Sequence, residues 1–99
     1  MQVTIQSAGI NLNSDFERQI RRKLQFSFSR IEPYITTISI SINSVTNIID
    51  HSDIHCRLTL DIVNQPSVVI EDTQMTLECV IDRVLQKASR TVERLIFNA

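Results

Sequence analysis

The chain has 99 residues, enough for one domain with a hydrophobic core of its own. Hydrophobic residues make up 42% and charged residues 21%, as in a folded soluble domain, and the formal net charge is -1. A single glycine excludes a glycine-rich phosphate loop, the lack of any run of about 18 apolar residues excludes a membrane-spanning helix, and two cysteines are too few for a disulfide framework. We therefore expect one cytoplasmic domain over residues 1–99, without a signal peptide.

The first part of the chain predicts a strand followed by a helix. Val3 and Ile5 alternate with polar residues, which is typical of a short strand. After a turn, Asn13 or Ser14 can cap a helix whose apolar residues recur at helical spacing. These apolar residues are Phe16, Ile20, Leu24, Phe28 and Ile31. Pro33 should end the helix, because the residue before a proline is disfavoured in the helical conformation.

The rest of the chain predicts three strands and a second helix. Isoleucine or another apolar residue stands at every second position of two segments, so one face of each strand should lie in the core. The strands are expected at residues 37–43, 55–62 and 68–70. A turn is expected at 64–67, a loop or ragged strand ends at 43–53, and a loop at 71–75. From about Thr76 the apolar residues recur at helical spacing, which predicts an amphipathic helix.

The resulting order of elements, β-α-β-β-β-α, predicts an α+β fold. Three consecutive strands joined by short connections favour an antiparallel meander. A helical crossover would place the first strand beside the second and make the four-stranded sheet mixed. Two helices packed on one face would cover the apolar side of that sheet.

Positive charge is concentrated in the two predicted helices. Residues 15–30 carry a net charge of +3 and residues 77–99 a net charge of +1, whereas residues 31–76 carry -5. In the second helix the basic residues are four, three and four positions apart, which places them on one face. They are Arg83, Lys87, Arg90 and Arg94. Two adjoining basic helix faces would neutralise phosphates rather than read bases, and the alternative is a solvated face that serves only solubility.

Three segments of the chain resemble a known protein family. Residues 17–24 and 30–35 read ERQIRRKL and RIEPYI, and residues 81–90 read IDRVLQKASR. They are similar to the first helix, its exit and the second helix of the ribosome hibernation promoting factor and ribosome-associated inhibitor family, also called the sigma-54 modulation protein family. The order of elements is also that of the family. At 99 residues the chain is similar to its short type. The resemblance implies a fold like that of double-stranded-RNA-binding domains.

The resemblance also implies a function. Family members are non-catalytic factors that bind the small ribosomal subunit and its RNA where messenger and transfer RNA would sit, and they inhibit translation or stabilise idle ribosomes in stress or stationary phase. The RNA-binding residues that this implies, including two looser matches at positions 22 and 83, are Arg22, Lys23, Arg30, Arg83, Lys87, Arg90 and Arg94. No cofactor, small-molecule substrate or membrane partner is expected, and a weak homodimer is left open.

Two departures from the family keep a second function open. The residues after Arg94 lack the lysines that the family usually has there, and segment 71–75 is about two residues longer than usual. The alternative is therefore a diverged protein-protein interaction or regulatory module of the same fold. Its contact would be the acidic strand region or the apolar pair Ile96 and Phe97.

Three other features of the sequence contain residue types that occur in functional sites. His51, Asp53 and His55 would share one side of an extended chain, but no fourth ligand follows, and no metal site is expected. Cys56 and the second cysteine, Cys79, lie on or beside apolar faces without a base that could activate them, so no catalytic thiol is expected. Phe26 lies off the apolar stripe of the first helix; we expect it at the rim of the core, and the alternative is an exposed ring that stacks on a base or packs on a partner.

Overall fold

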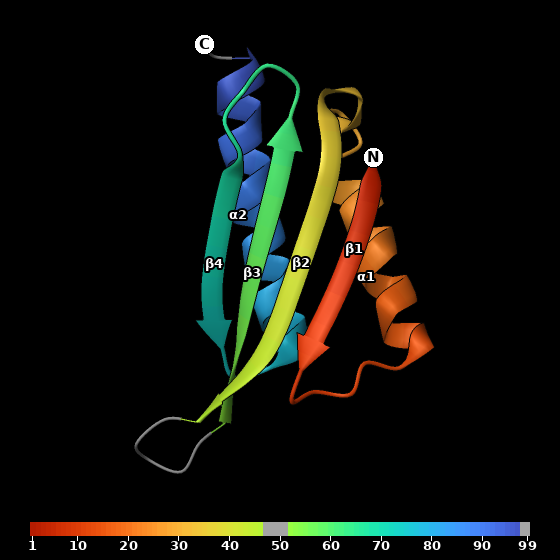
Figure 1. Ribbon diagram of the computed structural model, residues 1–99, viewed down its shortest axis with the longest axis vertical. Helices are drawn as coiled ribbons and strands as arrows, with labels where there is room; N and C mark the ends of the chain where they lie inside the picture. The colour runs from red at the N-terminus through yellow and green to blue at the C-terminus, as the bar shows by residue number, and fades with distance from the viewer. Residues whose placement is uncertain (47–51, 98–99) are drawn as a thin grey trace.

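The computed structural model describes residues 1–46 and 52–97 and contains the predicted order of elements (Figure 1). The elements are β1 (Gln2–Ala8), α1 (Ser14–Ser27), the short 3-10 helix η1 (Glu32–Tyr34), β2 (Ile35–Thr46), β3 (Ser52–Ile62), β4 (Val68–Gln74) and α2 (Leu77–Phe97). The α+β class predicted from the sequence is confirmed. Within these residues no helix is both long and apolar enough to cross a membrane.

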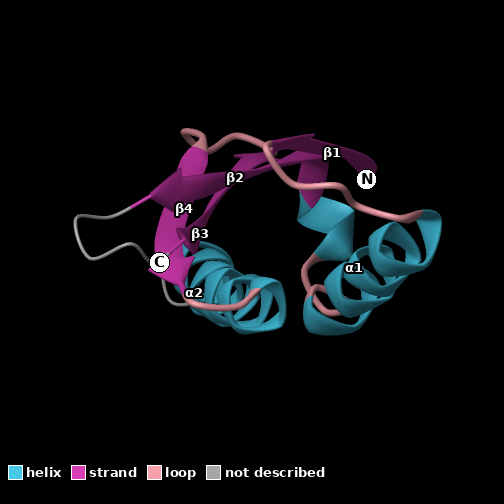
Figure 2. Ribbon diagram, turned by 90° about the horizontal axis from the view of Figure 1, so that it is seen from below, coloured by secondary structure: helices cyan, strands magenta, loops and turns pink. Residues whose placement is uncertain are grey.

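The four strands form one mixed sheet in the order β1-β2-β3-β4. β1 pairs with β2 in parallel, and the pairs β2–β3 and β3–β4 are antiparallel. A parallel pair needs a crossover, and α1 provides it. Both helices lie on the same face of the sheet, so the molecule has two layers (Figure 2). The mixed sheet and its one-sided helical layer agree with the sequence prediction.

The core lies between the sheet and the two helices. Ile38, Ile40 and Ile42 of β2 are at most 1% exposed, and the alternating residues of β3 are buried beside them. From the helical layer, Leu24 and Val84 close the core and are fully buried. The opposite face of the sheet carries polar side chains and no helix, which explains why strict alternation was visible in the sequence.

α1 begins as predicted but ends earlier than Pro33. The Asn13 side chain caps the helix by accepting a hydrogen bond of 2.7 Å from the Phe16 backbone N–H. At the other end Phe28 is the C-cap, and the backbone N–H of Ile31 donates to its carbonyl. Phe28 and Ile31 are still buried, at 0% and 1% exposure, because the turn that follows α1 directs both side chains into the core. Helical spacing therefore predicted their burial correctly, but it wrongly extended α1 beyond Ser27.

The strands extend beyond their predicted ends. β4 runs to Gln74 through the segment expected to be a loop, because the pairing with β3 continues as far as Gln74 opposite Ile54. β2 reaches Thr46 and β3 begins at Ser52, so much of the polar segment 43–53 is strand. Polar sequences have low intrinsic strand preference, and here the neighbouring strand supplies the hydrogen-bonding partner. His51 lies outside the described residues.

The two cysteines should report on the core through their reactivity. Cys56 is fully buried, and burial together with the charge of Asp72 raises the pKa of its thiol to about 12. Cys79 is exposed. Because the thiolate is the reactive form, a disulfide reagent such as DTNB should react with one thiol in the folded protein and with two in denaturant. Cys79→Ser should remove the fast reaction. Two fast thiols in the folded wild type would contradict the buried position of Cys56.

Candidate nucleic-acid interface

A groove runs between α1 and α2 on the outer side of the helical layer. Its volume is about 650 Å³. Figure 2 views the two helices nearly end on, side by side beneath the sheet. The residues that line the groove are Arg22, Lys23, Phe26, Ser27, Asp82, Leu85, Gln86, Ser89 and Arg90. Three of the seven basic residues predicted as RNA contacts are therefore brought together in one groove.

Two of these three cations are available to a ligand. Lys23 is half-buried, and its Nζ lies 2.7 Å from Oδ1 of Asp82, which ties α1 to α2. Arg22 of α1 and Arg90 of α2 are exposed, and neither makes an ion pair or a hydrogen bond with the part of the chain that is described. The groove thus presents one free guanidinium from each helix, a geometry suited to phosphate groups.

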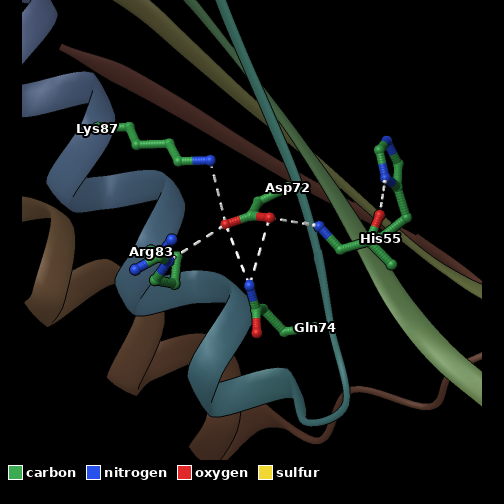
Figure 3. Close-up of polar contacts among 6 residues, drawn as sticks. His55, Asp72, Gln74, Arg83 and Lys87 are labelled. Atoms are coloured by element: carbon green, nitrogen blue, oxygen red, sulfur yellow. Dashed lines mark hydrogen bonds and ion pairs between the residues drawn. The ribbon is translucent and has the colours of Figure 1, made fainter.

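Arg83 and Lys87 do not line the groove; they lie toward β4, where Asp72 engages both of them (Figure 3). Oδ2 of Asp72 is 3.5 Å from Nε of Arg83 and 3.3 Å from Nζ of Lys87. The carboxylate also accepts hydrogen bonds from the Thr73 backbone N–H and the Gln74 side chain. Its side chain is only 14% exposed.

The hydrogen bonds outweigh the effect of burial on Asp72. Burial alone would raise the pKa of this carboxyl group, but the Thr73 N–H, Lys87 and Gln74 lower it below its usual value of 3.8. Asp72 is therefore ionised at neutral pH and partly neutralises the first half of the basic stripe on α2.

The last two predicted contacts lie near the C-terminal end of α2. Arg30 is 3.8 Å from Oε1 of Glu93 and stands over the ring of Phe97, 5.2 Å from its centroid. Phe97 also meets Tyr34 edge to face, with ring centroids 6.1 Å apart. Arg94 is exposed in the last turn of α2, where a cation interacts favourably with the helix dipole, and it has no ion pair within the described ranges.

Two acids that control this surface were not predicted from the sequence. Asp72 belongs to the acidic segment 31–76, yet its side chain points toward α2 (Figure 3). The signal was present in the alternation of β4, because Val68 and Ile70 are core-facing and Asp72 is the next residue on that face. Asp82 pairs with Lys23 on the other helix, and residue spacing within one helix does not predict such a contact.

The expected burial of Phe26 is wrong, since 86% of the side chain is exposed. Ile20 and Leu24 on the neighbouring face of α1 are buried, and Phe26 instead lines the groove four residues beyond Arg22. The alternative of an exposed ring is the one that the structure supports.

His55 lies on the uncovered face of the sheet. Its Nδ1 is 2.8 Å from Oγ1 of Thr73, and its Nε2 is 3.2 Å from Oε1 of Glu71. Residues 1–46 and 52–97 contain no group of three or more His, Cys, Asp or Glu side chains that could hold a metal ion.

Comparisons with known proteins find solved structures of the same architecture and a matching family. A ribosomal subunit interface protein from Coxiella burnetii has a TM-score of 0.77 at 11% identity, with 96% of this chain and 97% of that chain covered. The N-terminal domain of Protein Y from Thermus thermophilus also has a TM-score of 0.77, at 14% identity, over 96% of this chain and 99% of that chain. At such identities the two structures show a shared fold.

No curated protein matches the sequence. The family described as sigma 54 modulation protein / S30EA ribosomal protein matches residues 3–96. The chain, with its two basic helices on one side of a mixed sheet, therefore belongs to the sigma 54 modulation protein / S30EA ribosomal protein family.

Proposed function

We propose that this protein is a non-catalytic cytoplasmic factor that binds the RNA of the small ribosomal subunit and inhibits translation or stabilises idle ribosomes under stress. The observation that carries this proposal is the pair Arg22 and Arg90 in the groove between α1 and α2. Both side chains are exposed and have no ion pair among the described residues, and the chain belongs to the sigma 54 modulation protein / S30EA ribosomal protein family. Exposed guanidinium groups bind phosphates in pairs of hydrogen bonds, and they need not compete with an internal carboxylate here.

The remaining predicted contacts are proposed to act around this groove. Lys23 borders it, and Arg94 extends the basic surface toward the end of α2. Arg30, Arg83 and Lys87 each have an internal acidic partner, so their contribution to RNA binding requires exchange of a carboxylate for a phosphate. The net charge of -1 does not oppose this function, because charge segregated onto one surface can orient the molecule toward a polyanion.

Co-sedimentation with purified small ribosomal subunits tests the proposal. Binding should weaken steeply with salt: if three phosphates are neutralised, raising the salt from about 50 to about 200 mM should reduce the affinity about 40-fold. The slope of the logarithm of affinity against the logarithm of salt concentration then measures the number of phosphates in contact. Absence of sedimentation with subunits at low salt would reject the proposal.

A second function is supported by the apolar surface at one end of the molecule. Tyr34, Val63 and Phe97 are between 41% and 53% exposed, and the Val63 backbone N–H donates to the Tyr34 carbonyl, so they lie close together. A protein partner could pack on this end. Affinity capture that recovers one protein partner and no ribosomal RNA would favour an interaction module over a ribosome-binding factor.

A further inference from the structure

The ring of Phe26 stands in the groove without packing on the core. It belongs to the same lining as Arg22, Arg90 and the polar side chains of Gln86 and Ser89. Phe26 follows Arg22 by four residues on α1, so the two side chains are neighbours on one helix face. The groove therefore combines an exposed aromatic face with guanidinium groups from both helices.

This combination matches the chemistry of an unpaired nucleotide. Phosphates bind free guanidinium groups, and an unstacked base packs on an aromatic ring. A fully paired duplex offers phosphates but keeps its base faces stacked on each other. The groove volume of about 650 Å³ lies within the range of roughly 300–1,000 Å³ that is usual for ligand pockets.

The lining does not suit a docked amphipathic helix. Its apolar members are Phe26 and Leu85, and Leu85 is only 3% exposed. A helix that binds in a groove requires a continuous apolar surface for several anchoring side chains. Lys23 and the two free arginines outnumber Asp82, so the groove is positively charged.

We propose that the groove between α1 and α2 binds one unpaired RNA nucleotide, with its base stacked on Phe26 and its flanking phosphates bound by Arg22 and Arg90. This proposal rests on the proposed RNA-binding function and adds to it a site that prefers unpaired over fully paired RNA. The base is held by its ring face, so the site is expected to tolerate different bases.

Two RNA hairpins that differ only in the base of a single bulged nucleotide test this site. One carries a bulged adenosine and the other an abasic bulge, so their phosphates are identical. The wild type should bind the adenosine bulge on the order of tenfold more tightly in fluorescence anisotropy. Phe26→Leu should lose this preference while the salt dependence of binding stays unchanged, because no charge is removed. Met75→Ala, which removes an apolar side chain that is 75% exposed outside the groove, is the control and should bind like the wild type.

Phe26→Trp supplies a direct signal and keeps the proposal testable if leucine perturbs α1. The chain has no tryptophan, so the emission would come from this position alone. The variant should retain the preference, and the adenosine bulge should quench its emission more than the abasic bulge does.

Several outcomes would overturn the nucleotide site. If Phe26→Leu keeps the wild-type preference, or if the wild type does not distinguish the hairpins, the site is excluded while salt-dependent RNA binding stands. If neither hairpin nor the small subunit is bound, the proposed function fails as well. Displacement of the RNA by an acidic peptide whose own binding requires Phe26 would assign the groove to a protein partner.

Discussion

Arg22→Glu combined with Arg90→Glu is expected to abolish small-subunit binding at moderate salt, with a loss of affinity on the order of 100-fold or more. The two changes replace both free cations of the groove by anions, so phosphate attraction becomes repulsion from either side. Folding should be unaffected, because both side chains are exposed and neither holds an ion pair in the described structure. Co-sedimentation and anisotropy measure the loss, and urea unfolding measures the stability.

A second double variant makes the same change in charge elsewhere. Arg21 lies on the flank of α1 next to β1, where it donates to the Val3 carbonyl over 3.5 Å, and Arg57 lies on the uncovered face of the sheet. Arg21→Glu combined with Arg57→Glu should reduce the affinity only through the long-range electrostatic field of the protein. This loss of affinity should therefore largely disappear when the salt concentration is raised. Equal losses in the two double variants would show that net charge, rather than the groove, controls binding.

Asp72→Asn is expected to strengthen RNA binding while it weakens the fold. The change removes the negative charge that engages Arg83 and Lys87, so both cations become available to phosphates. We expect an affinity gain of roughly fivefold, about 1 kcal/mol, and a salt slope that steepens by about 0.9 for each additional phosphate contact. The free energy of unfolding at pH 7 should fall by about 1 kcal/mol, because hydrogen bonds to a charged acceptor are replaced by weaker ones.

The pH dependence of stability should identify the same carboxylate. Since the folded-state pKa of Asp72 lies below 3.8, this group stabilises the fold above pH 3.8, and its contribution is lost as the pH falls through the lower folded pKa. Urea unfolding between pH 7 and pH 3 should therefore show a smaller loss of stability for Asp72→Asn than for the wild type. Parallel curves would contradict the assigned role of the carboxylate.

Asp61→Asn is the matched control for this variant. Asp61 is also a hydrogen-bonded carboxylate with a lowered pKa, caused by Ser67 and Thr37, but it is exposed on the side of the sheet away from the helices. The Asp61→Asn substitution removes the same negative charge as Asp72→Asn without releasing a basic side chain. If Asp61→Asn strengthened RNA binding as much as Asp72→Asn, release of Arg83 and Lys87 would not be the cause.

The elements of this fold were predictable because their signals are local. Alternating isoleucines in β2 and the apolar stripe of α2 repeat with the period of the structure that they form. The prediction was wrong where long-range contacts overrule local preference. Phe28 and Ile31 keep helical spacing but lie in a turn, because burial in the core can be reached from that conformation as well. Residues 71–74 form strand because β3 lies beside them.

The candidate interface was predictable to a smaller extent. The spacing of the basic residues on α2 indicated a shared, solvent-facing side, and all four are indeed exposed. Which of the four basic residues have an acidic partner was not predictable. Lys87 pairs with a carboxylate of β4, whereas Arg90 lines the groove between α1 and α2. Phe26 was misplaced for a related reason: an aromatic side chain beside an apolar stripe is buried only if a neighbouring element covers it, and here the groove leaves it exposed.

The sequence by itself determined the order of elements, the two-layer α+β fold and the concentration of positive charge on two helices, since these depend on residue periodicity and composition. The tertiary structure decided which of those charges are paired with an internal carboxylate. Lys23 and Asp82 are 59 positions apart in the chain, and Asp72 reaches Arg83 and Lys87 only because β4 packs against α2. An ion pair forms only where packing brings opposite charges within about 4 Å of each other, and among the described residues no carboxylate lies that close to Arg22 or Arg90.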